Sequence, residues 1–536
     1  MIPAYRSDSI SIGSLRLGGN EPVRIQSMTN TDTNNIDASV DQCIRMINAG
    51  AHMVRLTTQG SREVKSLVKI KESLHSLGYN TPVVADIHFK PGLAREAARV
   101  ADKIRINPGN YLKGGSVDTL LPDLIHTCKQ HNTSVRIGVN HGSLNESVLH
   151  EFGDTPAGMV WSAMEFLRIC KREGFENVVV SLKSSNPRVM IQSVRLLTRT
   201  MSVEGMSYPL HLGVTEAGDG IEGRIKSVTG MAPLLLEGMG DTIRVSLTEP
   251  PEAEIPVANM IAGLFPKPRE LPYDPFDLPW NPFDFGRRIS TGISGMGNGS
   301  KVKIISPVPP EPGADLHPGA AGPAAVSFKR WKQKPQLLDN SDHFLLLDRE
   351  DHSLQMIKSF LADFCSYNHS SPVVYRFLSM TEDSELFRMQ TAGELGSLLV
   401  DGVLDGIWVE NPHMTTDFIN ETLLMILQAA GARISKTEYI ACPSCGRTHF
   451  DIMARLNEIK MATSHLKALK IGVMGCMVNG PGEMADADYG YVGAGPGKVS
   501  LYKGKVLKYK NVPEQEALDL MVDLIKSEGD WIDPTT

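Results

Sequence analysis

The sequence predicts an α/β protein made of an amino-terminal (β/α)8 TIM barrel, an inserted α/β domain and a smaller carboxy-terminal α/β domain. Three observations lead to this prediction. β-Rich runs recur at intervals of about 31 residues, the size of one strand–helix repeat, over the first half of the chain. Two Pro- and Gly-rich tracts follow, and three of the seven cysteines gather near the end. A chain of 536 residues suggests about three domains, which we place at 1–265, 266–430 and 431–536.

The barrel prediction depends on regular alternation of strands and helices. The β-rich runs are VRIQSMT (23–29), MVRLTT (53–58), PVVADIH (82–88), KIRINPGN (103–110), SVRIGVN (134–140), NVVVSLKS (177–184), YPLHLGV (208–214) and DTIRVSL (241–247). Helical patterns lie between them. One begins at Asp37 as N-cap and stops at Gly50, and others span 61–78 and 187–202. Eight similar repeats favour a closed barrel, although an open doubly wound sheet has the same alternation.

The composition argues against several classes of protein. Lys plus Arg number 54 against 61 for Asp plus Glu, and the net charge of −7 argues against a nucleic-acid partner. No apolar stretch reaches the roughly 18 residues that span a membrane, and the amino terminus lacks the apolar core of a secretion signal. We therefore expect a cytoplasmic protein without membrane contact. The chain has seven cysteines, which are few for its length and odd in number, so a disulfide scaffold is not expected.

Cations lie on the barrel strands near the carboxyl ends, the face at which barrel enzymes carry their active sites. A single such residue is usually a surface side chain or half of an ion pair. Several in one enclosed mouth repel each other unless an anion neutralises them. Arginine binds phosphate bidentately, so we expect a ligand with two phosphates. The cations are Arg55, Arg105, Arg136, Lys183 and Arg244, and the neutral donors nearby are Asn107, Asn140 and Ser246.

Three titratable side chains share this face and are candidates for proton transfer. Asp86 and His88 follow the third strand, and Glu216 follows the seventh. Carboxylates beside so many cations should be ionised, which suits a base or an orienting group, whereas an acid needs local burial to raise its pKa. The alternative is that Asp86 and Glu216 only pair with the arginines.

The carboxy-terminal cysteines indicate a metal centre. Cys442 and Cys445 form a Cys-x-x-Cys pair after the apolar run TEYIAC, and Cys476 follows a second run, IGVMGC. A Cys-x-x-Cys pair alone also suits zinc or a redox disulfide. Thioredoxin-like chemistry needs no third cysteine, whereas zinc would need His449 as a fourth ligand and would leave the anionic site without chemistry. An iron–sulfur cluster is the preferred interpretation, with the zinc site left open.

A [4Fe–4S] cluster normally takes four cysteines, and this region offers three. The others are predicted to be small buried hydrophobes on helices: Cys43, Cys128, Cys170 and Cys365. The turn-rich segment NGPGE ends at Glu483, whose carboxylate could complete the set. An oxygen ligand is easily displaced, so that iron could bind a substrate oxygen directly.

The glycine-rich segment GAGPGK (493–498) does not predict a nucleotide site. The phosphate-binding pattern needs glycine where Val492 stands, and Ser or Thr where Val499 stands. A hairpin turn is the better interpretation.

The middle of the chain begins with Pro- and Gly-rich tracts at 265–283 and 306–323, which we interpret as linkers. Beyond them DHFLLLD (342–348), PVVYRFLS (372–379) and DGIWVE (405–410) alternate with helical patterns, so an α/β domain is expected. It contains no evident catalytic cluster, and a spacer or scaffold role is expected.

Taken together, these motifs resemble the 4-hydroxy-3-methylbut-2-enyl diphosphate synthase (GcpE) family, in its longer, three-domain form. The resemblance covers roughly residues 5–265 and 436–530. It rests on VRIQSMTNTDT, VADIHF, KIRINPGN, VRIGVNHGSL, VVVSLKSS, HLGVTEAG, GDTIRVSLTEPP, ACPSCGRT and GCMVNGPGE. It implies reductive ring opening and dehydration of 2-C-methyl-D-erythritol 2,4-cyclodiphosphate at a [4Fe–4S] cluster, in the non-mevalonate pathway to isoprenoids, with electrons from ferredoxin or flavodoxin.

The resemblance also implies residue roles. Cys442, Cys445, Cys476 and Glu483 would hold the cluster, and Glu216 and Asp86 would be the acidic groups near the substrate. The diphosphate contacts would be Arg55, Arg105, Arg136, Asn140, Lys183, Arg244 and Ser246. The carboxy-terminal domain would share the α/β fold of sulfite and nitrite reductases. Short members are thought to cap one subunit's barrel with its partner's cluster domain, whereas the insertion would let one chain close on itself. Whether this chain forms a homodimer therefore stays open.

Two other functions compete with this one. The first is a phosphate-binding barrel transferase, similar to pterin-binding synthases, with a zinc-stabilised appendage. The second is an iron–sulfur electron carrier or redox sensor whose barrel binds an anionic regulator. The identity of the metal distinguishes the zinc-stabilised transferase from the two iron–sulfur proteins. Turnover of the cyclic diphosphate distinguishes the synthase from the electron carrier or sensor.

Overall fold

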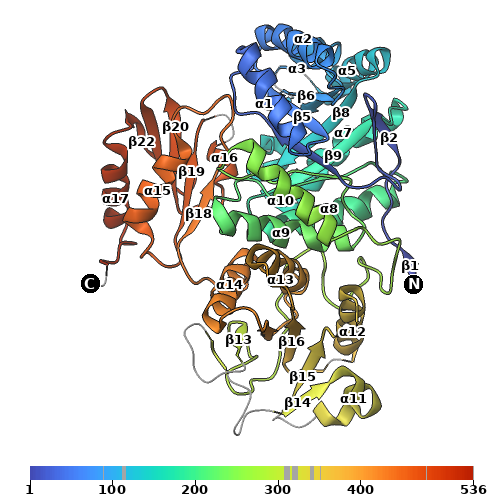
Figure 1. Cartoon of the computed structure of the whole chain (residues 1–536), viewed down its shortest axis with the longest axis vertical. Coiled ribbons are helices and arrows are strands. Elements are labelled where there is room, and N and C mark those ends of the chain that lie inside the picture. The colour runs from blue at the N-terminus through green and yellow to red at the C-terminus, as the bar shows by residue number, and fades with distance from the viewer. Residues whose placement is uncertain are drawn as a thin grey trace. The chain divides into compact units, whose positions relative to one another are not determined.

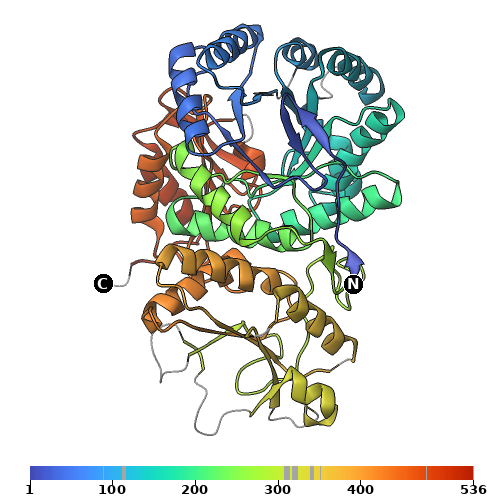
Figure 2. The same ribbon diagram turned by 45° about the vertical axis from the view of Figure 1, so that its right-hand side comes forward.

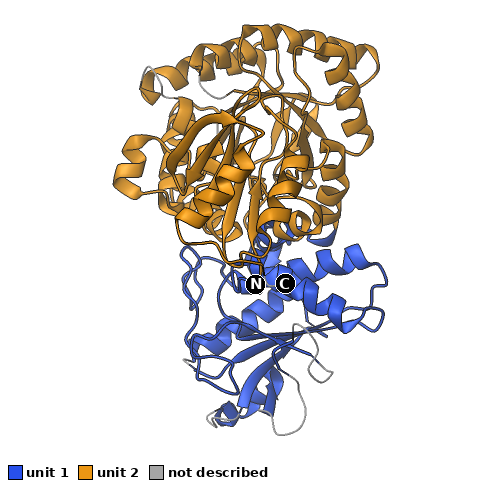
Figure 3. Ribbon diagram, turned by 90° about the vertical axis from the view of Figure 1, so that its left-hand side faces the viewer, with its two compact units in different colours: residues 1–4, 228–238, 264–435 blue, residues 5–227, 239–263, 436–536 orange. Residues whose placement is uncertain are grey.

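The computed structural model describes residues 1–87, 90–111, 116–306, 314–316, 324–338, 343–350, 352–367, 369–477 and 480–534. These residues form two compact units (Figure 3). Unit 1 comprises Met1–Ala4, Val228–Gly238 and Leu264–Ser435. Unit 2 comprises Tyr5–Ser227, Met239–Gly263 and Lys436–Thr536, and so contains most of the barrel together with the carboxy-terminal segment. The division into three domains at 265/266 and 430/431 stays a prediction.

In the described part of unit 2, eight parallel strands follow one another around a barrel (Figure 1). A bridge between Val180 and Leu210 joins the last strand of the sheet to the first, so the ring is closed. The predicted closed barrel is therefore confirmed, and the open sheet is excluded. The strands are β4 (Arg24–Met28), β5 (Met53–Thr57), β6 (Val83–Asp86), β7 (Lys103–Ile106), β8 (Ser134–Asn140), β9 (Val178–Lys183), β10 (His211–Leu212) and β11 (Thr242–Ile243).

Helices follow the barrel strands, as expected from the apolar periodicity. They are α1 (Ile36–Asn48), α2 (Ser61–Ser76), α3 (Pro91–Ala98), α4 (Pro108–Tyr111), α5 (Val117–His131), α6 (Glu146–Phe152), α7 (Pro156–Arg172), α8 (Pro187–Val203), α9 (Gly220–Leu236) and α10 (Pro251–Leu264). The prediction of Asp37 as the first N-cap was wrong. Asn35 caps α1, because its side chain accepts a hydrogen bond from the Ala38 N–H.

A short hairpin covers the amino ends of the barrel strands. It consists of β2 (Ile10–Ile12) and β3 (Leu15–Leu17). Its buried side chains Ile10, Ile12 and Leu17 pack in one apolar cluster with residues at the starts of the strands, Met53 among them. Since apolar packing fills this end, polar side chains can gather at the other end of the barrel.

The carboxy-terminal segment of unit 2 forms a mixed sheet in the order β18-β19-β20-β21-β22. The strands are β18 (Glu438–Ala441), β19 (Lys470–Met474), β20 (Tyr489–Gly495), β21 (Lys498–Lys503) and β22 (Val506–Pro513). The helices are α15 (Ile452–Thr463), α16 (Gly480–Glu483) and α17 (Ala517–Ser527). Both apolar runs that precede the cysteines are strands, β18 and β19, as predicted. The segment GAGPGK forms the turn between β20 and β21, so the hairpin prediction is also confirmed.

The carboxy-terminal segment is joined to the barrel through both main chain and side chains. Ala217, after β10, forms a parallel bridge with Ala441, the last residue of β18. Lys226 pairs with Glu438 at 2.7 Å, and Lys460 pairs with Asp219 at 2.5 Å. These contacts bring the loop after β10 beside the cysteine-bearing loop after β18.

Unit 1 contains the inserted α/β fold, which Figure 2 shows in yellow to brown. Its described strands form a parallel sheet in the order β13-β17-β16-β15-β14. They are β13 (Lys303–Ile305), β14 (Ala324–Ser327), β15 (His343–Asp348), β16 (Val373–Leu378) and β17 (Gly406–Glu410). The helices are α11 (Phe328–Gln333), η1 (Pro335–Leu338), α12 (Leu354–Ser366), α13 (Ser384–Leu399) and α14 (Thr416–Ala429). The α/β prediction is confirmed.

The two predicted linkers have different outcomes. The tract at 265–283 contains only the two-residue strand β12 (Glu270–Leu271), which pairs with β1 (Ile2–Pro3). Most of 306–323 lies outside the described residues. Within the described ranges, no helix is both long and apolar enough to cross a lipid bilayer.

A buried ion triad lies within unit 1. The Lys358 ammonium on α12 lies 2.6 Å from Glu237 and 2.7 Å from Asp401. All three side chains are nearly inaccessible to solvent. Removing one member of such a group leaves the opposite charge buried without its full compensation.

Replacing Lys358 with Met should lower the free energy of unfolding of unit 1 by about 3–5 kcal/mol, because two buried carboxylates lose the cation between them. Denaturant titration followed by circular dichroism measures the change. The matched control is Lys332→Met, whose partner Asp363 lies 2.8 Å away on the exposed surface. That change should cost less than about 1 kcal/mol. Equal losses in the two variants would show that burial of the triad is unimportant.

Candidate functional site

One cavity lies where the carboxyl ends of the barrel strands meet the carboxy-terminal segment. All of its lining residues belong to unit 2. From the barrel they are Met28, Arg55, Asp86, Arg105, Arg136, Asn140, Lys183, Thr215, Glu216, Arg244 and Ser246. From the carboxy-terminal segment they are Cys442, Pro443, Cys445, Arg447, Met474, Cys476, Gly480 and Glu483. The cavity thus combines the predicted anion site with the predicted metal ligands.

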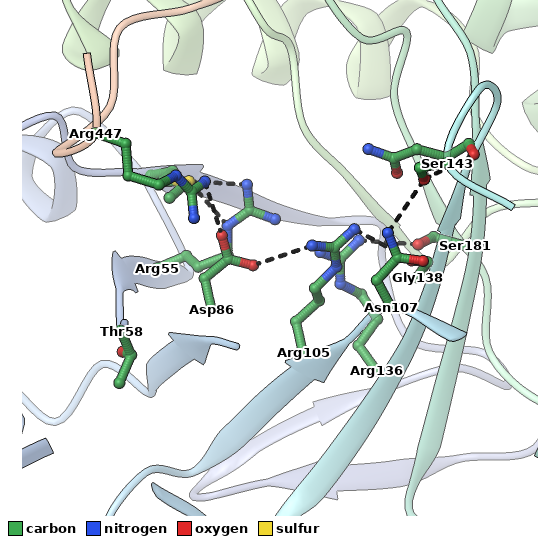
Figure 4. A network of polar contacts seen from close by, with 12 residues as sticks. Arg55, Thr58, Asp86, Arg105, Asn107, Arg136, Gly138, Ser143, Ser181 and Arg447 are labelled. Atoms are coloured by element: carbon green, nitrogen blue, oxygen red, sulfur yellow. Dashed lines mark hydrogen bonds and ion pairs between the residues drawn. The ribbon is translucent and has the colours of Figure 1, made fainter. Parts of the chain in front are cut away.

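Asp86 organises one side of the cavity (Figure 4). Its carboxylate, at the end of β6, lies 3.6 Å from the Arg105 guanidinium and 3.4 Å from that of Arg447. Arg105 also donates to the Gly138 carbonyl at 3.1 Å. Asp86 therefore pairs with a cation from the barrel and with one from the carboxy-terminal segment.

Arg55 points into the cavity from β5. Its Nε and Nη2 lie 3.1 and 2.8 Å from the Met28 sulfur, a weak acceptor. Burial lowers the pKa of Arg55 to about 10, with Asp86 opposing the shift and Arg244 adding to it. The guanidinium is thus desolvated, and among the described residues no carboxylate lies at hydrogen-bonding distance from it.

Arg136 and Lys183 are also almost fully buried. Arg136 enters from β8 and donates to the Ser181 hydroxyl at 2.9 Å. Burial lowers the pKa of both groups well below the usual values, and the neighbouring arginines lower them further. An anion bound here would reverse part of this effect, because opposite charge favours the protonated forms.

Arg244 is held by a carboxylate that the sequence did not indicate. Glu254, in the first turns of α10, lies 3.3 Å from the Arg244 guanidinium. The same carboxylate accepts hydrogen bonds from Ser27 Oγ at 3.0 Å and from the Leu247 N–H at 3.2 Å. Glu254 therefore fixes the orientation of Arg244 from below the cavity.

Glu216 follows β10 in a left-handed backbone conformation with φ of 47°. It is almost fully buried. Burial, followed by the neighbouring Glu483, raises the pKa of Glu216 well above its usual value. The shift is toward the protonated form, the direction that the sequence analysis required of an acid, because burial and a second carboxyl oppose the effect of the nearby cations.

Glu483 ends the single helical turn α16, where the sequence predicted a turn-rich loop. Its Oε1 accepts a hydrogen bond of 2.6 Å from Asn140 at the end of β8. Gly142 has φ of 79°, and a side chain at this position would overlap the Gly482 carbonyl. The two glycines thus allow the backbones to approach closely enough for Asn140 to reach Glu483.

The three cysteines surround the cavity from two loops of the carboxy-terminal segment. Cys442 directly follows β18, and its Sγ accepts a hydrogen bond of 3.2 Å from the Gly475 N–H. Burial raises the pKa of Cys442 well above its usual value. Coordination to a metal would overcome this, because bound thiols lose their proton. Backbone N–H donation to sulfur is one of the contacts that tune iron–sulfur clusters.

Arg447 lines the cavity together with these cysteines. Burial lowers the pKa of Arg447, but Cys445, Asp86 and Cys476 together outweigh it, so its pKa is above the usual value. A guanidinium beside thiols stabilises their ionised forms.

The donor set fits a multi-iron cluster better than a single zinc ion. Among the described residues, no group of three His, Cys, Asp or Glu side chains would hold one metal ion. The alternative fourth zinc ligand, His449, is exposed and does not line the cavity. Each iron of a [4Fe–4S] cluster takes its own protein ligand, so ligands spread around a cavity suit it.

The other cysteines have the predicted structural role. Cys43, Cys128 and Cys170 are buried on helices, and Cys365 is partly buried on α12. Burial raises the pKa of Cys43, Cys128 and Cys170 to about 12 in each case. Such thiols are unreactive and pack as small hydrophobes.

The structure brings nearly all of the predicted site residues together. Asn107 is an exception, since it does not line the cavity. Its side chain instead donates to Ser143 Oγ and accepts from the Gly109 N–H. His88 lies outside the described residues. Sequence reasoning missed Arg447 and Glu254, which hold charges in place. It also missed the lining residues Met28, Thr215, Pro443, Met474 and Gly480. Arg447 stands inside the quoted motif ACPSCGRT, which was the available signal.

Comparisons with known proteins agree with this arrangement. Residues 7–259 match the GcpE TIM-barrel domain, and residues 438–527 match the GcpE protein C-terminal domain. A curated 4-hydroxy-3-methylbut-2-en-1-yl diphosphate synthase (flavodoxin) from Parabacteroides distasonis is 42% identical, covering 98% of both chains. The corresponding protein from Protochlamydia amoebophila is 36% identical over 98% of this chain and 96% of its own.

A more distant relative extends the comparison beyond bacteria. The chloroplastic 4-hydroxy-3-methylbut-2-en-1-yl diphosphate synthase (ferredoxin) of Arabidopsis thaliana is 35% identical, over 99% of this chain and 88% of its own. These relatives span the inserted segment as well as the barrel, so the predicted resemblance to a long form is confirmed. From the two domain matches and the near full-length relatives, we conclude that this chain belongs to the GcpE family.

Proposed function

We propose that this chain converts 2-C-methyl-D-erythritol 2,4-cyclodiphosphate to (E)-4-hydroxy-3-methylbut-2-enyl diphosphate. The reaction opens the cyclic diphosphate ring, consumes two electrons and two protons, and releases water. The names of the relatives support the product. The observation that carries the proposal is the single cavity lined both by buried cations and by Cys442, Cys445, Cys476 and Glu483.

The cations would bind the diphosphate of the substrate. Arg55, Arg105, Arg136, Lys183 and Arg244 line the cavity from five different barrel strands or their ends. Their burial makes the site costly without an anion, so a ligand with several negative oxygens would be bound strongly. Asn140 and Ser246 would add neutral hydrogen bonds. Arg244 would be kept in its orientation by Glu254.

The thiolates of Cys442, Cys445 and Cys476 and the carboxylate of Glu483 would hold a [4Fe–4S] cluster. When bound, such a cluster would supply electrons one at a time to the substrate. Asn140 donates to one oxygen of Glu483 and would leave the other oxygen available as a ligand.

Glu216 is the candidate proton donor. Burial and the neighbouring Glu483 raise its pKa, which favours the protonated carboxyl, and it lines the same cavity as Glu483. A neutral carboxyl at this place would hydrogen bond the leaving oxygen of the substrate and protonate it as the carbon–oxygen bond breaks. Asp86, paired with two arginines, would orient cations and not transfer protons.

The electrons would come from a small redox protein. The relatives carry the designations flavodoxin and ferredoxin, which differ between the bacterial and plant proteins. We propose that one of these two classes of donor reduces the cluster in this chain.

Anaerobically purified protein should contain near four irons and four sulfides per chain and should convert the cyclic diphosphate when supplied with reduced flavodoxin or ferredoxin. Metal and sulfide analysis measures the cluster content, and mass spectrometry of the product measures the conversion. One zinc without sulfide would contradict the proposed cofactor. A loaded cluster without turnover by either donor would favour a carrier or sensor role.

Replacing Glu483 with Ala should leave part of the cluster bound by the three cysteines but reduce kcat at least about tenfold, because one iron loses its displaceable ligand. Iron content and steady-state kinetics check the two effects separately. Glu458→Ala, on the surface of α15, is the matched control and should change neither. Full activity in Glu483→Ala would remove this residue from the ligand set.

Replacing Arg136 with Met should weaken substrate binding by about 2 kcal/mol, because one charge-assisted contact to phosphate is lost. Anaerobic calorimetry with the cyclic diphosphate measures the change in Kd. Arg168→Met on α7 removes a guanidinium whose partner Glu204 lies 2.7 Å away near the surface, and should leave Kd unchanged. Unchanged affinity in Arg136→Met would mean that this arginine supports the barrel and not the ligand.

A further inference from the structure

Arg447 is the cationic side chain among the described cavity residues that comes from the carboxy-terminal segment. It follows Cys445 by two positions, in the loop after β18. Gly446 packs so closely on the barrel that a Cβ there would lie 2.8 Å from the Thr31 carbonyl oxygen. This close approach of the loop directs the Arg447 side chain toward the end of β6.

The guanidinium lies between the two halves of the site. On the barrel side, Nη2 lies 3.4 Å from Asp86 Oδ2, which Figure 4 shows opposite Arg105. On the other side, Arg447 lines the same cavity as Cys445, two positions before it, and Cys476. Both thiols raise the pKa of Arg447. Its side chain is only 10% exposed, so these charges interact with little screening by water.

The direction of this interaction follows from charge. An iron–sulfur cluster gains one negative charge with each electron that it accepts from the donor. A fixed positive charge beside its thiolate ligands stabilises that more negative form, and net charge and hydrogen bonds to sulfur are among the factors that set cluster potentials. Asp86 partly offsets the cation and holds it in place.

We propose that Arg447 is a positioning residue that raises the reduction potential of the cluster and, through Asp86, links that potential to the substrate-binding end of the barrel. The inference rests on the proposed function, because it requires a cluster on Cys442, Cys445 and Cys476. Asp86 pairs with both Arg105 and Arg447. A phosphate bound by Arg105 would compete with Asp86 for that cation. The pairing of Asp86 with Arg447 would then change, and with it the electric field of Arg447 at the thiolates.

The test is a spectroscopic redox titration of the anaerobically loaded full-length protein and of three variants. In Arg447→Met the ratio of reduced to oxidised cluster at a fixed potential should fall about tenfold, which is a midpoint about 59 mV lower for a one-electron couple. Arg447→Lys keeps the charge and should remain near the wild-type midpoint. Arg455→Met removes a guanidinium from α15 that pairs with Glu514 at 2.8 Å outside the cavity, and it should leave the midpoint unchanged.

Addition of the cyclic diphosphate provides a second readout. The substrate should shift the midpoint of the wild-type protein and of Arg447→Lys by a larger amount than that of Arg447→Met, since only the first two retain the cation between the thiols and Asp86. Equal shifts in all three would contradict the proposed link.

Each outcome bears on the inference. An unchanged midpoint in a fully loaded Arg447→Met protein would overturn it. If Arg447→Met loses its iron while Arg447→Lys retains it at the wild-type midpoint, the charge is required and the inference is supported. If both lose their iron while Arg455→Met keeps it, the residue serves the fold of the loop and the inference fails. Wild-type protein without iron and sulfide would instead refute the proposed function itself.

Discussion

The arrangement of this molecule depends on the cost of burying several positive charges in one place. Six cationic side chains line the described part of the cavity, and desolvation weakens the protonated forms of Arg55, Arg105, Arg136 and Lys183. The barrel compensates only partly, with Asp86 and Glu254. The site keeps a net positive charge after this compensation. A bound polyanion would neutralise that charge, so the site favours such a ligand.

The site is assembled from two distant parts of the sequence, and main-chain contacts bring them into position. Gly142 and Gly482 approach closely enough to place Glu483 beside Asn140, and Gly446 packs against Thr31 to direct Arg447 toward Asp86. Close backbone contacts of this kind prevent the two segments from shifting against each other. The cations of the barrel and the cysteines of the carboxy-terminal segment are therefore held at fixed distances from one another. Precise placement matters here because both sets of groups line one cavity and would act on the same ligand.

Much of the fold was predictable from the sequence, because strands and helices of a barrel follow local apolar periodicity and recur at constant length. The cations and the cysteines were predictable as well, since strand ends and Cys-x-x-Cys turns have local signatures. The contacts of Arg447 and Glu254 were not predictable, because their partners are set by tertiary structure. Arg447 lies in a motif that the sequence shows, but its partner Asp86 lies 361 positions away. Asn107 was predicted as a site residue but does not line the cavity. A local contact explains this, because its side chain accepts a hydrogen bond from the Gly109 N–H in the neighbouring turn. The upward shift in the pKa of Glu216 depends on burial. No sequence pattern around this residue indicates that it is buried.

The bridge between Ala217 and Ala441 limits how this site can change during evolution. Glu216 precedes one bridged residue, and Cys442 follows the other. Because the bridge is formed by backbone groups, a different small side chain at 217 or 441 would preserve it. Insertion or deletion of one residue between either bridged position and its functional neighbour would rotate that neighbour away from the cavity. The two loops should therefore accept substitutions far more readily than changes in length, and variation in length should be confined to segments remote from this bridge.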